Sequence, residues 1–284
     1  MMDRKKLATS AVKEAERLRI KAKVPPSNSV DPVDVAVEVC RCRVQFQPVS
    51  SLEGMYSPTP RPTIIIGSER PPGRQHYTCA HELGHHIFGH GACIDELGSA
   101  PGNKSEELLA EMFAGYFLMP KLAVTKALAQ RGYTAGSLTP EQVFRIACYF
   151  GVGYSTILTH MHHSLATISY SEMKDLQGVQ PKVIKASYEV TPQTSMILAD
   201  RFWIGRAINL EVGDALLIPV GCELESSKCM RVVGELRGFL KCEAVAPGYS
   251  RAFEAPSGWA IHVRVSRKNY QGLSRYRFLE EVEE

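Results

Sequence analysis

The stretch His81–His85, with the sequence His-Glu-Leu-Gly-His, constrains this chain more than any other feature. It lies inside an apolar run, CAHELGHHIFGH, which favours a helix. In a helix, His81 and His85 lie one turn apart on the same face, so both imidazoles can reach one metal ion. Glu82 follows the first histidine, where its carboxylate can contact a metal-bound water without being a ligand. The motif therefore predicts a hydrolytic metal site with Glu82 as the catalytic base.

A catalytic zinc ion usually takes three protein ligands and one water, so two histidines leave the site incomplete. Residues 105–120, SEELLAEMFAGYFLMP, form an apolar run that predicts a buried helix. Glu107 and Glu111 lie one turn apart on that helix, whereas Glu106 points about 100° away. We expect Glu107 to bind the metal and Glu111 to accept the outer N–H of a ligand histidine. The alternative is that these carboxylates only form an acidic first turn that complements the helix dipole.

His90 is a competing candidate for the third ligand. The three-histidine pattern H-E-x-x-H-x-x-G-x-x-H spaces its last histidine differently from this chain, in which Gly89 directly precedes His90. On a straight helix, His90 also lies about 180° from His81. We therefore expect His86 and His90 to be structural or solvent-facing.

Two patterns surround the motif. The first is R-x-x-Y/F-T-x-A-H-E-L-G-H, and the second, on the next predicted helix, is E-x-x-x-[ND]-x-F-A-x-x-x-L-M-P. The matching residues are Arg74, Tyr77, Thr78, residues 80–85, Glu107, Phe113, Ala114 and residues 118–120. In these residues the chain resembles the ImmA/IrrE family of metallopeptidases, over roughly residues 10–165. The departure is Glu111, where relatives usually carry Asn.

The resemblance implies His81, His85 and Glu107 as metal ligands. Zn²⁺ suits this ligand set best, and manganese or iron also fits it. The resemblance further implies a zinc-dependent endopeptidase that cleaves a helix-turn-helix transcriptional repressor, thereby derepressing stress or mobile-element genes. A second hypothesis is a non-catalytic regulatory binding protein with a structural metal and a ligand-sensing C-terminal domain. The presence of Glu82 argues against it, because a structural site needs no base.

Composition indicates a folded soluble protein, since 44% of the residues are apolar and 22% are charged. The net charge of +3 is too small to indicate nucleic-acid or membrane binding. No run approaches the roughly 18 apolar residues of a membrane helix, and the basic start of the chain lacks a secretory signal. The eight cysteines are scattered without a C-x-x-C pair, so we expect free thiols and a cytoplasmic location.

Hydrophobic periodicity and the resemblance together predict an α+β fold in three parts. Residues 1–122 form a zincin-like metallopeptidase core, in which the two site helices accompany a small sheet. Residues 123–165 form a helical, helix-turn-helix-like segment, with Thr139 as a helix cap and a turn at Gly151. Its second helix lacks basic residues, so direct DNA binding is not expected. Residues 166–284 form a β-rich α+β domain, a candidate sensor domain.

Several local expectations are open to test. Residues 54–56 and 63–66 predict short strands that either pair with an extended substrate or only fill the core. Residues 91–104 predict a polar loop at the border of the cleft. In the last part, residues 166–173 and 183–190 predict strands and residues 198–208 predict a helix. Four large residues there form either a ligand pocket or ordinary core: Arg201, Trp203, Arg206 and Trp259.

Overall fold

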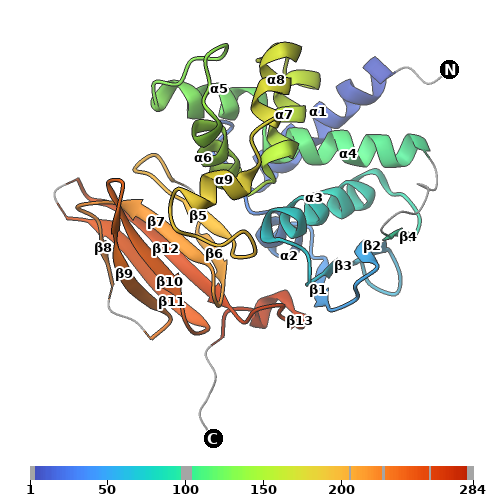
Figure 1. Cartoon of the computed structure of the whole chain (residues 1–284). Coiled ribbons are helices and arrows are strands. Elements are labelled where there is room, and N and C mark those ends of the chain that lie inside the picture. The colour runs from blue at the N-terminus through green and yellow to red at the C-terminus, as the bar shows by residue number, and fades with distance from the viewer. Residues whose placement is uncertain (1–3, 97–103, 205, 226–227, 256, 280–284) are drawn as a thin grey trace, which may run out of the picture. The chain divides into compact units, whose positions relative to one another are not determined.

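The computed structural model describes residues 4–96, 104–204, 206–225, 228–255 and 257–279 (Figure 1). The fold is mixed α+β, as predicted. The chain forms two compact units. Unit 1 consists of Met1–Val124 and Asn269–Arg275, and unit 2 consists of Thr125–Lys268 and Tyr276–Glu284. Unit 2 therefore holds most of the predicted helical segment together with most of the β-rich part, and the three-part division of the sequence stays a prediction.

Unit 1 contains one mixed sheet with the strand order β13-β1-β3-β2-β4. Strands β1 and β3 are parallel, and the other pairs are antiparallel. On the side of β3 that faces the core, Ile64 and Ile66 are fully buried. The strands are β1 (Arg43–Gln47), β2 (Leu52–Ser57), β3 (Thr63–Gly67), β4 (Cys93–Glu96) and β13 (Gly272–Leu273).

The strand order resolves one open alternative and corrects one expectation. Strands β2 and β3 each have a neighbour on both sides, so neither predicted substrate strand has a free edge. In the part of unit 1 that the structure describes, β4 is the edge strand on this side. It arises from the predicted loop 91–104, because residues 93–96 pair with β2. The rest of that prediction falls on residues 97–103, outside the described residues.

Helices pack around this sheet and against one another in unit 1. Helix α2 begins as its sequence predicts, since the Asp31 carboxylate accepts hydrogen bonds from the backbone N–H groups of Val33 and Asp34. Helix α4 packs against both α1 and α3 (Figure 1). The helices are α1 (Arg4–Lys21), α2 (Pro32–Glu38), α3 (Pro72–Phe88) and α4 (Lys104–Leu118).

The stretch Lys104–Gln130, which spans α4 and the following helix, is long and apolar enough to cross a membrane by length and composition alone. The expectation that no such stretch exists is therefore wrong. Half of the apolar window is buried inside the structure, however. On α4, Phe113 and Phe117 are fully buried and stack on each other. Packing against α1 and α3 accounts for the apolar composition of α4.

The helices of unit 2 include two that the sequence predicts as strands. Residues 170–177 form α8, because the Ser169 hydroxyl caps it by accepting from the backbone N–H of Glu172. Residues 181–186 form α9, which begins at Pro181. In both segments, the alternation of polar and apolar residues is short. The helix-start signals at Ser169 and Pro181 therefore outweigh it. The helices are α5 (Lys121–Gln130), which begins in unit 1, α6 (Pro140–Phe150), α7 (Tyr154–His163), α8 (Tyr170–Gln177) and α9 (Pro181–Ala186).

Helices α6 and α7 follow the predicted local pattern. Thr139 and Gln142 form a capping box at the start of α6. Gly151 ends α6 in the left-handed conformation, with φ of 67°. The helix-turn-helix-like interpretation of this pair stays a prediction.

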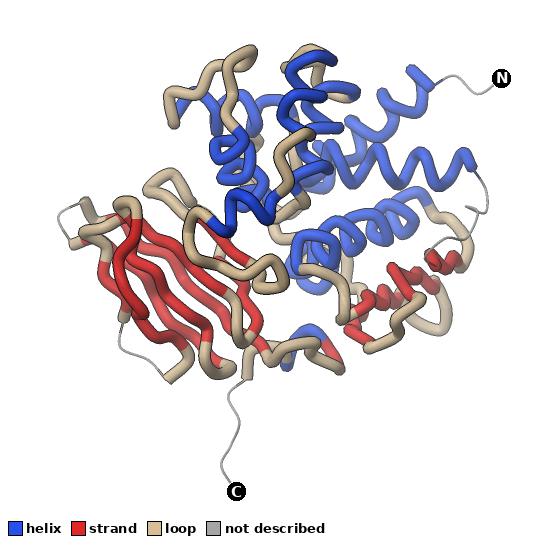
Figure 2. The backbone as a smooth tube through the Cα atoms, in the orientation of Figure 1, coloured by secondary structure: helices blue, strands red, loops and turns tan. Residues whose placement is uncertain are grey.

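Two four-stranded sheets complete unit 2, drawn in red in Figure 2. Their orders are β5-β7-β10-β9 and β6-β12-β11-β8. Every residue of β7 is buried, so the first sheet has a central hydrophobic strand. The strands are β5 (Met196–Leu198), β6 (Ile208–Glu211), β7 (Ala215–Pro219), β8 (Glu223–Leu224), β9 (Met230–Leu236), β10 (Phe239–Ala244), β11 (Gly248–Glu254) and β12 (Trp259–Ser266).

Residues 198–208 are not the predicted helix, and side-chain contacts explain the irregular backbone. The Trp203 indole is buried and donates to the Arg206 carbonyl at 2.9 Å. Trp259 donates its indole N–H to the Trp203 carbonyl at 3.2 Å. The Arg206 guanidinium donates to the carbonyls of Cys148 and Tyr149. Three of the four candidate pocket residues, Trp203, Arg206 and Trp259, are therefore held by hydrogen bonds within unit 2.

Asp214, in the turn before β7, is a buried acid of unit 2. Its Oδ2 accepts a hydrogen bond from the Glu211 backbone N–H at 2.8 Å. Burial raises the pKa of Asp214 from 3.8 to about 7. Because the pKa is higher in the folded state, the free energy of unfolding falls as pH rises from about 4 to about 7. At about 1.4 kcal/mol per unit of pKa, the loss is on the order of 4 kcal/mol.

Asp214→Asn keeps the hydrogen-bond acceptor and removes this titration. We expect the variant to match the wild type near pH 4 and to exceed its stability by up to about 4 kcal/mol above pH 7. Urea unfolding across this pH range measures the difference. The exposed Asp175, replaced by Asn, serves as the control. A constant difference between Asp214→Asn and wild type across the range would contradict the prediction.

Candidate metal centre

Helix α3 places His81 and His85 side by side. Their Nε2 atoms lie 3.1 Å apart, and the two rings meet edge to face. His85 is 1% exposed, and the His81 side chain is 13% exposed. The one-turn spacing inferred from the sequence therefore brings both nitrogens to one point.

Helix α4 brings Glu107 to the same point. Its Oε2 lies 3.2 Å from the His81 Nε2 and 3.6 Å from the His85 Nε2. Phe113 of α4 packs edge to face on Phe88 of α3, which fixes the two helices against each other. The structure thus brings together the three residues predicted as metal ligands, with donor atoms within 4.8 Å of one another.

These donors fit a divalent metal ion. For tetrahedral coordination with bonds of about 2.0–2.2 Å, donor atoms lie about 3.3–3.6 Å apart. The separations of 3.1, 3.2 and 3.6 Å are close to this spacing. Two imidazoles and one carboxylate also leave a coordination position for water.

Glu82 projects from α3 toward strand β2 and is 0% exposed. Its Oε1 has no hydrogen-bond partner among the described residues. Burial raises the pKa of Glu82 well above its usual value, and this effect outweighs the nearby His81, which lowers it. A buried carboxylate beside the three metal donors can accept a proton and return it.

Gly54 of β2 makes room for this carboxylate. A Cβ atom at position 54 would lie 2.3 Å from the Glu82 Oε1 and 2.5 Å from the Thr78 Cγ2. We expect Gly54→Ala to displace Glu82, to reduce any peptide cleavage and to cost about 1–3 kcal/mol of stability by overpacking. Urea unfolding and a cleavage assay measure the two effects. Gly91→Ala is the control, because a Cβ there meets nothing within 4 Å.

His90 has a role that the sequence did not predict. Its Nδ1 lies 2.9 Å from the Nδ1 of His85, on the opposite side of the ring from Glu107. Gly89 ends α3 in the left-handed conformation, and the His90 N–H then bonds back to the His85 carbonyl. His90 therefore does not continue a straight helix, and the chain reversal carries its ring to His85.

Glu111 does not reach the cluster among the described residues. Its side chain is exposed, and its backbone carbonyl accepts a hydrogen bond from the Tyr77 hydroxyl at 3.3 Å. Burial, and then the Glu111 charge, raise the pKa of Tyr77. Glu111 was expected to accept a hydrogen bond from the outer nitrogen of a ligand histidine. In His85, that nitrogen faces His90 instead.

Two other residues near the motif have clear partners. The His86 Nδ1 lies 3.0 Å from the hydroxyl of the buried Tyr56, which fits the structural role expected of His86. Arg74 lies in the first turn of α3, and its Nε donates to the Glu53 carboxylate at 2.6 Å.

Strand β4 contributes two residues that the sequence analysis missed. The Asp95 Oδ2 lies 3.1 Å from the His81 Nε2, and the Cys93 Sγ lies 3.8 Å from the Glu82 Oε2. No motif marks these residues, and only the pairing of β4 with β2 brings them to α3. The alternation of a strand, with positions 93 and 95 on one face, is the one sequence signal that applies to them.

The charges of this cluster shift its titrations. Burial lowers the pKa of His81, but hydrogen bonds to Asp95 and Glu107 dominate and raise that pKa to about 10. Burial and the neighbouring His81 lower the pKa of His85 to about 4. The pKa of Cys93 rises to about 12, through burial and the Glu82 charge. Protons and a metal ion therefore compete for the His81 nitrogen.

Comparison with known proteins gives one family match. Residues 34–162 match the family described as Peptidase_M78, IrrE N-terminal-like domain. No curated protein matches the chain. A solved structure, a Mycobacterium tuberculosis transcriptional regulator, is similar at 16% identity and a TM-score of 0.37, over 54% of this chain and 46% of that one. The chain thus spans less than half of that structure's length, and so low a TM-score does not establish a common fold. This match supports a metallopeptidase domain of the ImmA/IrrE type over residues 34–162, just under half of the chain.

Proposed function

We propose that this chain is a zinc-dependent endopeptidase with a zincin-like core in unit 1. One observation carries the proposal: the donor atoms of His81, His85 and Glu107 converge beside the buried carboxylate of Glu82. A purely structural zinc site usually fills all four positions with protein ligands and does not require an acid next to them. The family match to metallopeptidases supports the same conclusion.

A bound zinc ion supplies a Lewis acid that makes water acidic and polarises a peptide carbonyl. Glu82 accepts the proton of the attacking water and returns it to the leaving amine. In its protonated form, the Glu82 carboxyl group can donate the proton in the second of these transfers. Gly54 has no side chain and so leaves the space beside β2 that this carboxylate occupies.

His90 positions His85, and Asp95 adds negative charge beside His81. His90 contacts the Nδ1 of His85, so its hydrogen bond sets the tautomer that leaves the His85 Nε2 free to bind metal. Asp95 lies on the His81 Nε2 and, with Glu107, balances the positive charge of the site. Zn²⁺ is the proposed metal, because two imidazoles and a carboxylate with an open position form a typical zinc site; Mn²⁺ is the alternative.

The proposed substrate is a helix-turn-helix transcriptional repressor in the cytoplasm, as the family resemblance implies. Direct DNA binding is not part of the proposal. Helix α7, the second of the helix-turn-helix-like pair, contains neither Lys nor Arg, whereas a helix that reads DNA carries basic residues. The eight free cysteines fit a reducing compartment.

The test is cleavage of a panel of purified helix-turn-helix repressors by the zinc-loaded full chain, followed by intact-mass spectrometry. We expect one repressor to yield two fragments whose masses sum to that of the substrate plus one water. A chelator should stop the reaction, and added Zn²⁺ should restore it. Cleavage of unfolded proteins at many sites would contradict the narrow substrate range. No cleavage of the panel or of a proteome-derived peptide library would contradict the peptidase function itself.

A further inference from the structure

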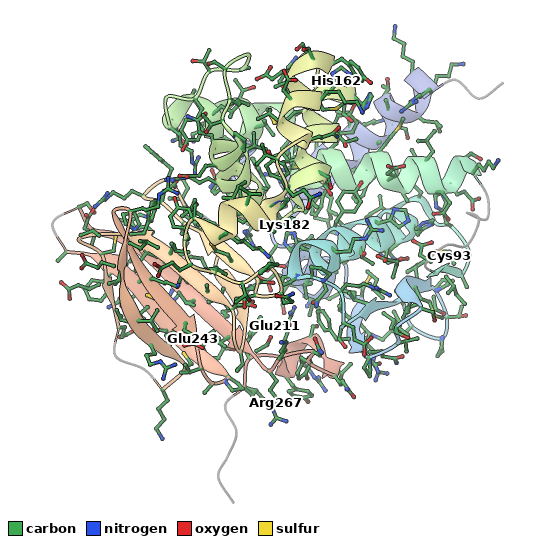
Figure 3. All side chains as sticks on the ribbon, in the orientation of Figure 1. Cys93, His162, Lys182, Glu211, Glu243 and Arg267 are labelled. Atoms are coloured by element: carbon green, nitrogen blue, oxygen red, sulfur yellow. The ribbon has the colours of Figure 1, made fainter. Side chains whose placement is uncertain are left out.

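Strand β4 presents two potential metal donors to the candidate metal centre, Cys93 and Asp95. They occupy alternate positions, so both side chains lie on the face of β4 that meets α3. Cys93, labelled in Figure 3, donates its S–H to the Glu82 Oε2 at 3.8 Å. Ile94, between them, is 59% exposed and lies on the other face.

Cys93 completes a second triad with residues of α3. The donor atoms of Glu82, His85 and Cys93 all lie within 4.8 Å of one another. A tetrahedral ion with bonds of about 2.3 Å to sulfur and about 2.1 Å to oxygen separates these two donors by about 3.6 Å. The observed 3.8 Å between the Cys93 Sγ and the Glu82 Oε2 is close to that value.

A second, independent observation points to a ligand at this triad. Glu82 is fully buried. Its Oε2 faces Cys93, and its Oε1, on the Gly54 side of the same carboxyl group, has no hydrogen-bond partner in the described part of the chain. A buried carboxylate oxygen without a partner is costly unless a cation or a donor satisfies it. The Glu82 carboxylate therefore has the capacity to coordinate an ion.

We propose that Glu82, His85 and Cys93 form an alternative, inhibitory metal site that binds thiophilic divalent ions such as Cd²⁺ or excess Zn²⁺. This inference rests on the proposed peptidase function, because inhibition has meaning only if Glu82 is the base. Thiolate ligands select soft and borderline ions, which distinguishes this site from the His81, His85 and Glu107 triad. On binding, the Cys93 S–H loses its proton to solvent and a metal–sulfur bond forms.

The two sites exclude each other because both use His85. When the second triad is occupied, His81 keeps two hydrogen-bond partners, Asp95 at 3.1 Å and Glu107 at 3.2 Å. With an ion in either triad, both His81 and His85 keep a partner. The ion can therefore occupy either of two alternative positions. In the second one, Glu82 is a ligand and cannot accept a proton from water.

The experiment is a titration of the metal-free full chain with Cd²⁺, followed by ultraviolet absorption for cadmium–thiolate charge transfer. We expect wild type to develop this band at about one ion per chain and Cys93→Ser to lack it. Cys40→Ser is the matched control, because Cys40 is another half-buried thiol of unit 1 that lies outside the triad. It should retain the band. Absence of the band in wild type, or its persistence in Cys93→Ser, would overturn the proposal.

Two further measurements remove the remaining ambiguity. The ¹¹³Cd magnetic resonance shift of wild type reports sulfur coordination without any substitution, so a misfolded variant cannot mimic the result. Glu107→Ala breaks only the first triad, so it should retain the cadmium–thiolate band. If wild type cleaves substrate but shows no sulfur coordination, the inhibitory site is wrong and the peptidase function stands. If the band forms as expected but zinc-loaded wild type cleaves nothing, the peptidase function is wrong and the Cys93 metal site stands without its inhibitory role.

Discussion

Glu82→Gln is expected to abolish peptide cleavage while leaving the zinc content unchanged. Glutamine has nearly the same shape as glutamate, but its amide does not accept a proton from water at neutral pH. Loss of a general base typically lowers the rate by about 10²–10⁴-fold. Zinc content should persist, because Glu82 is not one of the three donors that converge at His81, His85 and Glu107. Fragment formation by mass spectrometry and metal content by elemental analysis measure the two quantities on one preparation.

Glu106→Gln is the matched control for this experiment. It makes the same chemical change beside the predicted ligand Glu107, at a side chain that belongs to none of the metal-binding groups of the described residues. We expect it to retain both cleavage and zinc. Retained cleavage in Glu82→Gln would show that Glu82 is not the base. Loss of zinc in Glu82→Gln would instead show that Glu82 is a ligand in the resting protein.

The parts of the site predicted from sequence are those governed by helix geometry. His81 and His85 are separated by one helical turn, so their convergence required only that residues 81–85 be helical. Glu107 was predicted because the apolar pattern of residues 105–120 indicated a buried helix that carries it, and the family resemblance implied the same carboxylate. The structure places all three donor atoms together. Local spacing is informative here because 3.6 residues per turn holds regardless of the rest of the fold.

The expectation for His90 used the same geometry where it no longer applies. A straight helix points His90 away from His81, but α3 ends at Gly89 and the chain turns back. The His90 ring consequently reaches the outer nitrogen of His85, the kind of partner expected of Glu111. The glycine directly before His90 was visible in the sequence. Treating it as a helix end would have placed His90 near His85, within the structural role that was expected of it.

Asp95 and Cys93 could not be predicted in this way because strand pairing is non-local. Their positions depend on the antiparallel pairing of β4 with β2, and residues 91–104 resemble an ordinary polar loop. The same limit applies to β13, which pairs with β1 although more than half the chain separates them. In unit 2, segments 166–173 and 183–190 were assigned as strands from brief alternation, whereas Ser169 and Pro181 begin helices there.

Glu107→Ala is expected to remove most of the bound zinc, whereas Glu111→Ala is expected to retain about one zinc ion per chain. Glu107 supplies one of three donor atoms, and its Oε2 lies within 3.6 Å of both histidine nitrogens. Losing a ligand should weaken binding by more than the roughly 10–100-fold that loss of a supporting partner costs. Glu111 is exposed and contributes a backbone carbonyl to Tyr77, which the alanine variant preserves.

Elemental analysis after dialysis against a weak chelator separates the two carboxylates, and His85→Ala sets the lower limit. His85 belongs to both the first triad and the Cys93 triad, so its loss should leave neither complete. If the Glu107→Ala variant still holds some zinc, the His85→Ala variant should hold none. The double variant Glu107→Ala/Cys93→Ser should also hold none. Zinc loss in Glu111→Ala with full retention in Glu107→Ala would show that the wrong carboxylate of α4 was assigned. Metal-free wild type, even after reconstitution with Zn²⁺, would contradict the metal centre and favour a non-catalytic binding protein.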